Sequence, residues 1–259
     1  MRRFFHLLIS LIFHFPLSGQ PFQAQTLDGY SPMEMFSLQN PLRKQNDAHI
    51  TYRVESGELR QIYAPESNHR YGVYISSTYP LGHTGITGRA GYTRYYRKKQ
   101  RYCGMFRPAS PLIAFADTIP GNQKGEIYYL AGSIVHSFST CWNSELAIEY
   151  LAGNNAKDTD PRNKNNLNHI ALAPNFLYHL KNIQLGMTLF WRYGRETVSY
   201  GSFGHETKNG VTFYPLWFYT AESFADGLNA QRDYRSNFYR GNLNLQYKGK
   251  TWKTTLSPS

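Results

Sequence analysis

The stretch IQLGMTLFWRY, residues 183–193, alternates between two kinds of side chain. Its odd positions are all apolar and end in aromatic residues, whereas its even positions are mostly polar or glycine. Successive side chains of a β-strand point to opposite faces, so this stretch predicts a strand with one apolar and one polar face. Both a soluble β-sandwich and the wall of a membrane β-barrel use strands of this kind.

Similar alternating segments recur from residue 48 to the end of the chain. They are residues 48–63, 71–79, 85–96, 126–139, 144–152, 167–180, 183–193 and 237–248, and a ninth strand begins at Thr251. Most are longer than the ~5–6 residues of a typical soluble strand and suit the roughly 9–11 residues of a strand that crosses a bilayer at a tilt. The sequence therefore predicts an all-β fold, a transmembrane antiparallel meander β-barrel with about nine strands in this chain.

The connections between these segments alternate in length. Short turns are expected at 80–84, 140–143 and 181–182, and longer loops at 97–125, 153–166 and 194–236. Outer-membrane barrels have short periplasmic turns and longer extracellular loops, so the pattern favours a membrane barrel over a sandwich. The first strand must then run outward, which requires Ser56-Gly57 to be a bulge inside that strand.

The N-terminus predicts export. Residues 1–24 read as a signal peptide, in which Arg2 and Arg3 precede an apolar segment, and residues 25–47 read as a periplasmic extension. No internal segment approaches the roughly 18 apolar residues of a spanning helix, which argues against a helical membrane protein. The expected location is the cell outer membrane.

The chain is basic, with a formal net charge of +11. A basic protein is drawn to nucleic acid or to anionic membrane surfaces, and export favours the membrane. The basic, aromatic stretch YTRYYRKKQRY lies where the third strand would leave the membrane on the outside. Arg94 and Lys98 there are expected to contact lipopolysaccharide phosphates, and the alternative is a solvated loop base.

Three stretches carry a family resemblance: GITGRAGYTRYY (85–96), IEYLAGNNAKDTDPRNKN (148–165) and NFLYHLKNIQLGMTLFWRYG (175–194). With them, most of residues 48–259 resembles a large, functionally unassigned family of Gram-negative outer-membrane β-barrels. The resemblance implies the architecture and its location, and it brings no catalytic residues. The partners expected are outer-membrane lipid, lipopolysaccharide, a small solute and the barrel-assembly machinery, with no nucleic acid.

The strand count departs from that of a complete barrel. Bacterial barrels normally have an even number of strands, whereas here a ninth strand starts and the chain ends in TTLSPS. The first and ninth strands would run in the same direction, which prevents antiparallel closure. We expect the N-terminal part of a longer barrel, apparently truncated at the C-terminus, with an open or gapped sheet whose concave face is polar.

No segment of the sequence gives a strong signal for catalysis or metal binding. Asp158, Asp160, Asn163 and Asn165 faintly suggest a calcium loop, but the required glycine is missing and a polar surface loop is the preferred interpretation. The available histidines and serines do not select a hydrolase triad: His136, His169, His179, Ser133 and Ser137. No enzyme activity, metal or cofactor is expected. Cys103 and Cys141 are predicted at opposite ends of the barrel and therefore not bonded to each other.

The expected function is porin- or receptor-like passage of solutes across the outer membrane. The lumen-facing residues would be Arg89, Glu145, Glu149, Gln184, Thr188, Arg192, Arg240, Asn242, Asn244 and Gln246. The alternatives are a structural or surface-binding barrel with a plugged lumen and, third, a lipid-modifying enzyme. The aromatic segment 211–224 would be a luminal constriction, a ligand-binding cap or a tall hairpin.

Overall fold

The fold consists entirely of β-strands. The structure, a computed structural model, describes residues 44–57, 64–101, 106, 114–116, 119–159, 162–201, 210–214, 219–224, 229–248 and 253–256. These residues contain no helix, and so none that is long and apolar enough to cross a membrane. The predicted signal peptide, most of the predicted extension, Asp160 and Cys103 lie outside the described residues.

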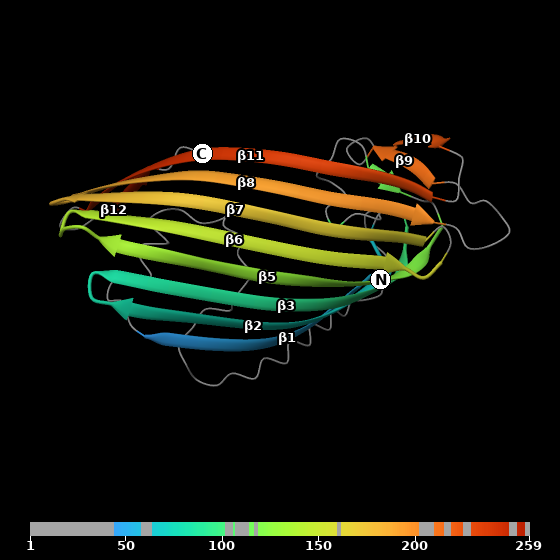
Figure 1. Ribbon diagram of the computed structural model, residues 1–259, viewed down its shortest axis with the longest axis horizontal. Helices are drawn as coiled ribbons and strands as arrows, with labels where there is room; N and C mark the ends of the chain where they lie inside the picture. Colours follow the sequence, from blue (N-terminus) through green and yellow to red (C-terminus); the bar gives the residue numbers. More distant parts are fainter. Residues whose placement is uncertain are drawn as a thin grey trace, which may run out of the picture.

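Nine strands form one antiparallel sheet in chain order (Figure 1). They are β1 (Gln45–Ser56), β2 (Ser67–Leu81), β3 (Thr84–Gln100), β5 (Gly121–Ser137), β6 (Trp142–Lys157), β7 (Arg162–Leu180), β8 (Ile183–Gly201), β11 (Asn229–Lys248) and β12 (Lys253–Leu256). The predicted meander is thus confirmed, and within the described residues the sheet is open, with β1 and β12 at its edges.

A second, small sheet was not predicted. It contains β4 (Ala114–Ala116), β9 (Gly210–Tyr214) and β10 (Tyr219–Phe224), in the order β10-β9-β4. β9 and β10 form an antiparallel hairpin, which agrees with the hairpin interpretation of the segment 211–224. Figure 1 shows this sheet at one end of the large sheet, where the longer connections lie.

The two ends of the large sheet differ, and we call them the turn end and the loop end. At the turn end, β2–β3 and β7–β8 are joined by the residue pairs 82–83 and 181–182. Gly82 and Lys181, the first residue of each pair, have positive φ angles of 62° and 47°. A β-hairpin with a two-residue loop needs this left-handed backbone conformation, which glycine adopts without strain.

Several predicted boundaries at the loop end were wrong. β3 continues to Gln100 and β8 to Gly201, and β5 starts at Gly121 and β11 at Asn229, so the expected loops 97–125 and 194–236 are shorter than predicted. β1 ends at Ser56, so Ser56-Gly57 begins the β1–β2 connection rather than forming a bulge, although β1 still runs from the turn end to the loop end as expected. The expected loop 153–166 is mostly strand, because β6 continues to Lys157 and β7 starts at Arg162. β1 also starts at Gln45, inside the predicted extension.

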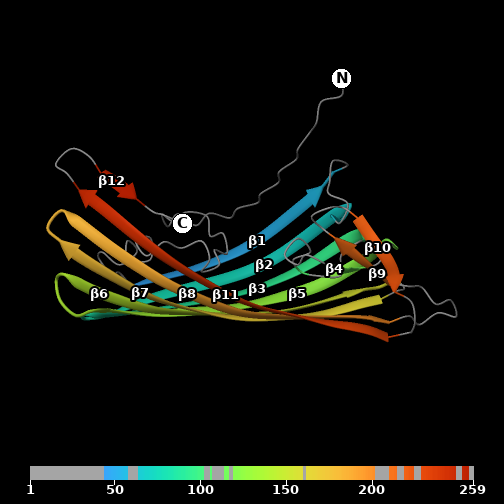
Figure 2. The same ribbon diagram turned by 90° about the horizontal axis from the view of Figure 1, so that it is seen from above.

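The sheet is curved, and its polar side is the concave side. Figure 2 shows the sheet bent into a trough. Tyr95 of β3 and Glu196 of β8 lie four strand spacings apart, roughly 19 Å in a flat sheet. Phe106 nevertheless contacts both, through a ring contact with Tyr95 (centroids 6.3 Å apart) and a backbone N–H that donates to Glu196 Oε1 (2.8 Å).

The two faces have opposite character. On the concave face side chains converge, and every buried polar residue in the described part of the chain lies there, from Asn68 on β2 to Gln246 on β11. On the convex face side chains diverge, and of the described residues all the exposed large apolar ones except Phe238 lie there. One buried apolar cluster on the concave face contains only Ala147, Ala171, Ala173 and Phe190. The sheet therefore exposes its apolar side and buries its polar side.

Candidate functional site

The structure places all ten predicted lumen-facing residues on the concave face. Strict alternation within β3, β6, β8 and β11, together with an unbroken register between β8 and β11, puts them on one side. Thr188 is paired with Asn242, and Gln184 with Gln246, across the β8–β11 boundary. The two residues predicted to contact lipopolysaccharide, Arg94 and Lys98, lie exposed on the convex face.

A row of charged residues crosses the concave face at mid-height. Residues paired in register across seven neighbouring strands are, in order, Asp47, Ser76, Arg89, Ala131, Glu149, Ala171 and Arg192. Every second strand contributes a charged residue to this set, and the sign of the charge alternates. Each strand between them contributes a small residue. The small residues leave room for the long side chains to lean over them, and Ala171 is fully covered. We call this set the charge row.

Glu149 lies between Arg89 and Arg192 in the charge row and is held by two donors. His169 Nε2 lies 3.2 Å from Glu149 Oε1, and the Tyr129 hydroxyl donates to Glu149 Oε2 at 3.3 Å. All three side chains are buried. A buried carboxylate is stable only when it is paired or hydrogen-bonded, which these contacts provide.

Nearer the turn end, Glu145 accepts a hydrogen bond from Asn175 Nδ2 at 3.4 Å. Beside it on the concave face, Thr188 is buried, and its hydroxyl has no partner among the described residues. A buried hydroxyl without a partner is costly unless water or a ligand reaches it. The concave face around Thr188 is therefore suited to hold a polar molecule.

Arginine and phenylalanine side chains interleave on β8 and β11. The Arg192 guanidinium lies 5.4 Å from the Phe238 ring centre, and that of Arg240 lies 5.6 Å from the Phe190 ring centre. The two rings meet edge to face, with centroids 6.0 Å apart. Cation–π contacts of this kind fix the direction of an arginine side chain.

An amide belt crosses the concave face closer to the loop end. It consists of Gln123, Asn155, Asn163 and Asn165, with Arg97 at one end and Glu196 at the other. Gln123 Nε2 donates to Asn155 Oδ1 (3.4 Å), and Asn163 Nδ2 donates to the same oxygen (3.0 Å). These links join β5, β6 and β7 through side chains that are almost completely buried.

The belt continues to β8, where Phe106 meets it. Asn165 Nδ2 donates to Glu196 Oε1 (3.3 Å), the same oxygen that accepts the backbone N–H of Phe106. The Phe106 ring also covers Gly153, where an added Cβ would approach the ring to 3.0 Å. Glycine at this position therefore makes room for Phe106 on the concave face.

One belt residue has an unused donor. Asn155 is 1% exposed, and its Nδ2 has no hydrogen-bond partner among the described residues. Because a buried donor without a partner costs roughly 1–3 kcal/mol, the position is suited to a bound water or to a polar group of a ligand.

The convex face carries two rows of aromatic residues. The row near the turn end contains Tyr79, Phe138, Trp142, Tyr178 and Tyr247, and the row toward the loop end contains Tyr52, Tyr71, Tyr92, Tyr128, Tyr150, Trp191, Tyr193 and Tyr239. Neighbours touch within each row: the rings of Trp142 and Tyr178 are 4.7 Å apart, and those of Tyr52 and Tyr71 are 4.8 Å apart. Mostly aliphatic side chains fill the band between the rows.

The candidate enzyme residues are not brought together. His136 lies on the convex face beside the Thr84 hydroxyl (2.9 Å), whereas His169 and His179 lie on the concave face with Glu149 and Gln184 as partners. No group of three or more potential metal ligands occurs within the described part of the chain. The Cys141 thiol is free, in the β5–β6 turn.

Sequence reasoning missed the amide belt. Asn163 and Asn165 were assigned to a polar surface loop, and that was wrong, because both are buried on β7. Their alternation with Arg162 and Lys164 was the available signal. Phe106 and Tyr129 carried no pattern that distinguished them from other aromatic residues.

Comparisons with known proteins identify the family without an activity. No curated protein matches the chain. A family of unknown function (DUF6850) matches residues 34–258, which include the whole of the described sheet, and the chain belongs to this family.

Proposed function

We propose that the chain forms the wall of an outer-membrane β-barrel and that its concave face lines a lumen through which small polar solutes pass. The observation that carries the proposal is the inverted distribution of side chains, with exposed apolar residues on the convex face and buried polar residues on the concave face. In water this arrangement would expose a large apolar surface, which soluble monomers avoid. In a bilayer it is the favoured arrangement.

The height of the apolar band supports the same proposal. Tyr71 and Tyr79 lie eight residues apart on one strand, as do Trp142 with Tyr150 and Tyr239 with Tyr247. Eight residues span about 27 Å along a strand, or about 21 Å across a membrane when the strand is tilted by ~40°. The apolar band of such barrels is ≈ 25 Å tall and bordered by aromatic girdles, which the two rows resemble.

The chemistry of the concave face suits polar solutes. The charge row presents both signs, and the amide belt presents donors and acceptors without net charge. The two zones lie at different heights. A solute that moved along the strands would therefore replace its hydrating water with contacts to one zone and then with contacts to the other. We expect no enzyme activity to accompany this passage.

One observation favours the alternative of a plugged lumen. Phe106 lies against the concave face and reaches from β3 to β8, so it occupies part of the cross-section at the height of the amide belt. In a plugged barrel this residue would belong to the permanent filling, whereas in a pore it would narrow the passage.

Planar-bilayer conductance of the full-length protein separates the two possibilities. Phe106→Ala removes the ring but keeps the backbone N–H bond to Glu196, so it should raise single-channel conductance if solutes pass this point. Phe176→Ala, on the convex face, is the matched control and should leave conductance unchanged. If neither the unmodified protein nor Phe106→Ala conducts, passage is excluded and the plugged barrel stands.

A further inference from the structure

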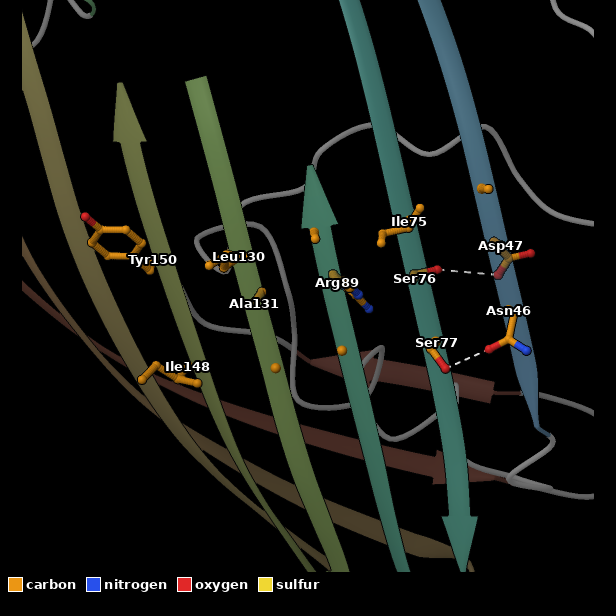
Figure 3. A pocket seen from close by; sticks show the side chains of 14 residues that line it. Asn46, Asp47, Ile75, Ser76, Ser77, Arg89, Leu130, Ala131, Ile148 and Tyr150 are labelled. Carbon is orange, nitrogen blue, oxygen red and sulfur yellow. Dashed lines mark hydrogen bonds between the residues drawn. The ribbon is translucent and has the colours of Figure 1, made fainter. Parts of the chain in front are cut away.

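The convex face carries an apolar groove of about 740 Å³, within the range of small-molecule sites (Figure 3). Ile75 lies on one side, and Leu130, Ile148 and Tyr150 lie on the other. The groove runs across β1, β2, β3, β5 and β6, between the two aromatic rows.

A pair of glycines creates the groove. Gly88 on β3 and Gly132 on β5 are paired in register on the convex face. A Cβ added at Gly88 would meet nothing within 4 Å, so the floor of the groove is open. Ala48 and Ala90 extend this low floor along the neighbouring row, while the surrounding large side chains are about half exposed.

Positive charge lies on the same face, toward the loop end. Arg94 and Lys98 follow Ala90 along β3, and Lys124 on β5 is paired with Tyr96, its Nζ 5.9 Å from the ring centre. We call Arg94, Lys98 and Lys124 the basic patch. Glu126, the carboxylate paired in register with Arg94, accepts a hydrogen bond from the Tyr128 hydroxyl at 2.9 Å, and the three cations of the patch outnumber it.

The spacing of groove and patch fits one lipid molecule. Gly88 and Arg94 are six residues apart, about 20 Å along the strand or about 15 Å across a membrane at a tilt of ~40°, which matches the roughly 15 Å depth of one leaflet's hydrocarbon. A lipid with its phosphate at Arg94 would therefore extend an acyl chain to the level of Gly88. Tyr92 lies between the groove and Arg94, and Tyr96 lies between Arg94 and Lys98, at the height where aromatic rings meet headgroups.

We propose that the groove and the basic patch form a binding site for one lipopolysaccharide molecule of the outer leaflet, with an acyl chain over Gly88 and Gly132 and a phosphate on Arg94 and Lys98. The site rests on the membrane location proposed above but not on solute passage. Lipid surrounds the whole wall of a membrane barrel, so apolar contact alone gives little selectivity for one lipid over another. Close packing in the groove must supply this selectivity. The charges select a phosphorylated headgroup.

Native mass spectrometry of the full-length protein, delipidated and titrated with lipopolysaccharide, tests the site. We expect one tightly bound copy, and about thirtyfold weaker binding in the double variant Arg94→Gln and Lys98→Gln. Lys164→Gln, on the convex face of β7, is the charge control and should bind normally. Lipopolysaccharide stripped of phosphate should bind unmodified protein as weakly as intact lipid binds the double variant.

The groove has its own matched pair of variants. Gly88→Leu fills the floor and should weaken binding about tenfold through lost packing. Gly241→Leu adds the same side chain on the convex face of β11, where an added Cβ would meet only Leu189 at 4.0 Å, and should have no effect. Equal binding by both glycine variants, or undiminished binding of phosphate-free lipid, would overturn the site while leaving the barrel proposal intact. Absence of the protein from outer-membrane fractions would overturn both the lipid site and the barrel proposal.

Discussion

Met187 and Thr188 are adjacent in the sequence but lie on opposite faces of β8. Met187 is on the convex face between the aromatic rows, so Met187→Arg should destabilise the protein in lipid vesicles by about 2–4 kcal/mol. Met187→Leu keeps an apolar side chain of similar volume and should cost less than about 1.5 kcal/mol. Urea unfolding in vesicles measures both. A spin label that is water-accessible at 187 and lipid-accessible at 188 would contradict the assignment of the faces.

Lys181 and Gly82 occupy equivalent places in two hairpin turns, and both have positive φ. A side chain in this conformation costs roughly 1 kcal/mol, so Lys181→Gly should stabilise the protein by up to about that amount. Gly82→Ala should destabilise it by about 1 kcal/mol, and through the backbone alone, because nothing lies within 4 Å of an added Cβ. Shifts of the urea midpoint in the same direction for both variants would refute this account.

Among the elements, the β6–β7 hairpin is fastened to β5 by Asp158. Its carboxylate accepts hydrogen bonds from the backbone N–H and side-chain amide of Asn122 (3.0 and 3.2 Å) and from the Thr159 hydroxyl (2.9 Å). Partial burial alone would raise the pKa of Asp158, but these hydrogen bonds outweigh it and hold the pKa below its ordinary value of 3.8.

This depressed pKa predicts a stability effect with a defined sign. The ionised carboxylate stabilises the folded state above the unfolded pKa, and the contribution is lost as the pH falls through the lower, native pKa. The unfolding free energies of unmodified protein and Asp158→Asn should therefore differ by a constant amount at pH 7 and pH 5 and converge below about pH 4. A difference that already shrinks between pH 7 and pH 5 would show that another group is responsible.

Strands were predicted correctly where one of their two faces is apolar. The prediction failed where both faces of a strand are polar. Residues 183–193 alternate strictly, and the strand and the face of each of its side chains were predicted from the sequence alone. The asparagine-rich segment around Asn155 and Asn163 resembles a loop in composition, yet it is strand, because its amides bond across neighbouring strands. These bonds join side chains of different strands, so the composition of the segment alone does not reveal them.

The residues of the candidate site also differ in whether the sequence alone could predict them. The faces of Arg89, Glu149 and Arg192 follow from alternation, so these residues could be named in advance. Their arrangement in one row required the register of five neighbouring strands, which no single segment encodes. Phe106 could not be placed at all, since its position depends on Tyr95, Gly153 and Glu196 from three strands.

At the scale of the whole molecule, the sheet edges decide whether the inverted faces can exist in a membrane. β1 is paired only with β2, and β12 only with β11, among the described strands. Each edge presents a row of backbone N–H and C=O groups, and in hydrocarbon every unpaired group costs several kcal/mol. A wall in a bilayer must therefore have both edges paired, whichever strands provide the partners.

Hydrogen exchange at β1 tests this requirement. In the full-length protein in lipid vesicles, the alternate β1 amides that point away from β2 should be as protected as those of β6 and β7 at the sheet centre, because only a paired edge is tolerated in lipid. If those β1 amides exchange rapidly in vesicles while β6 and β7 stay protected, β1 borders water, and the sheet is not a closed membrane wall.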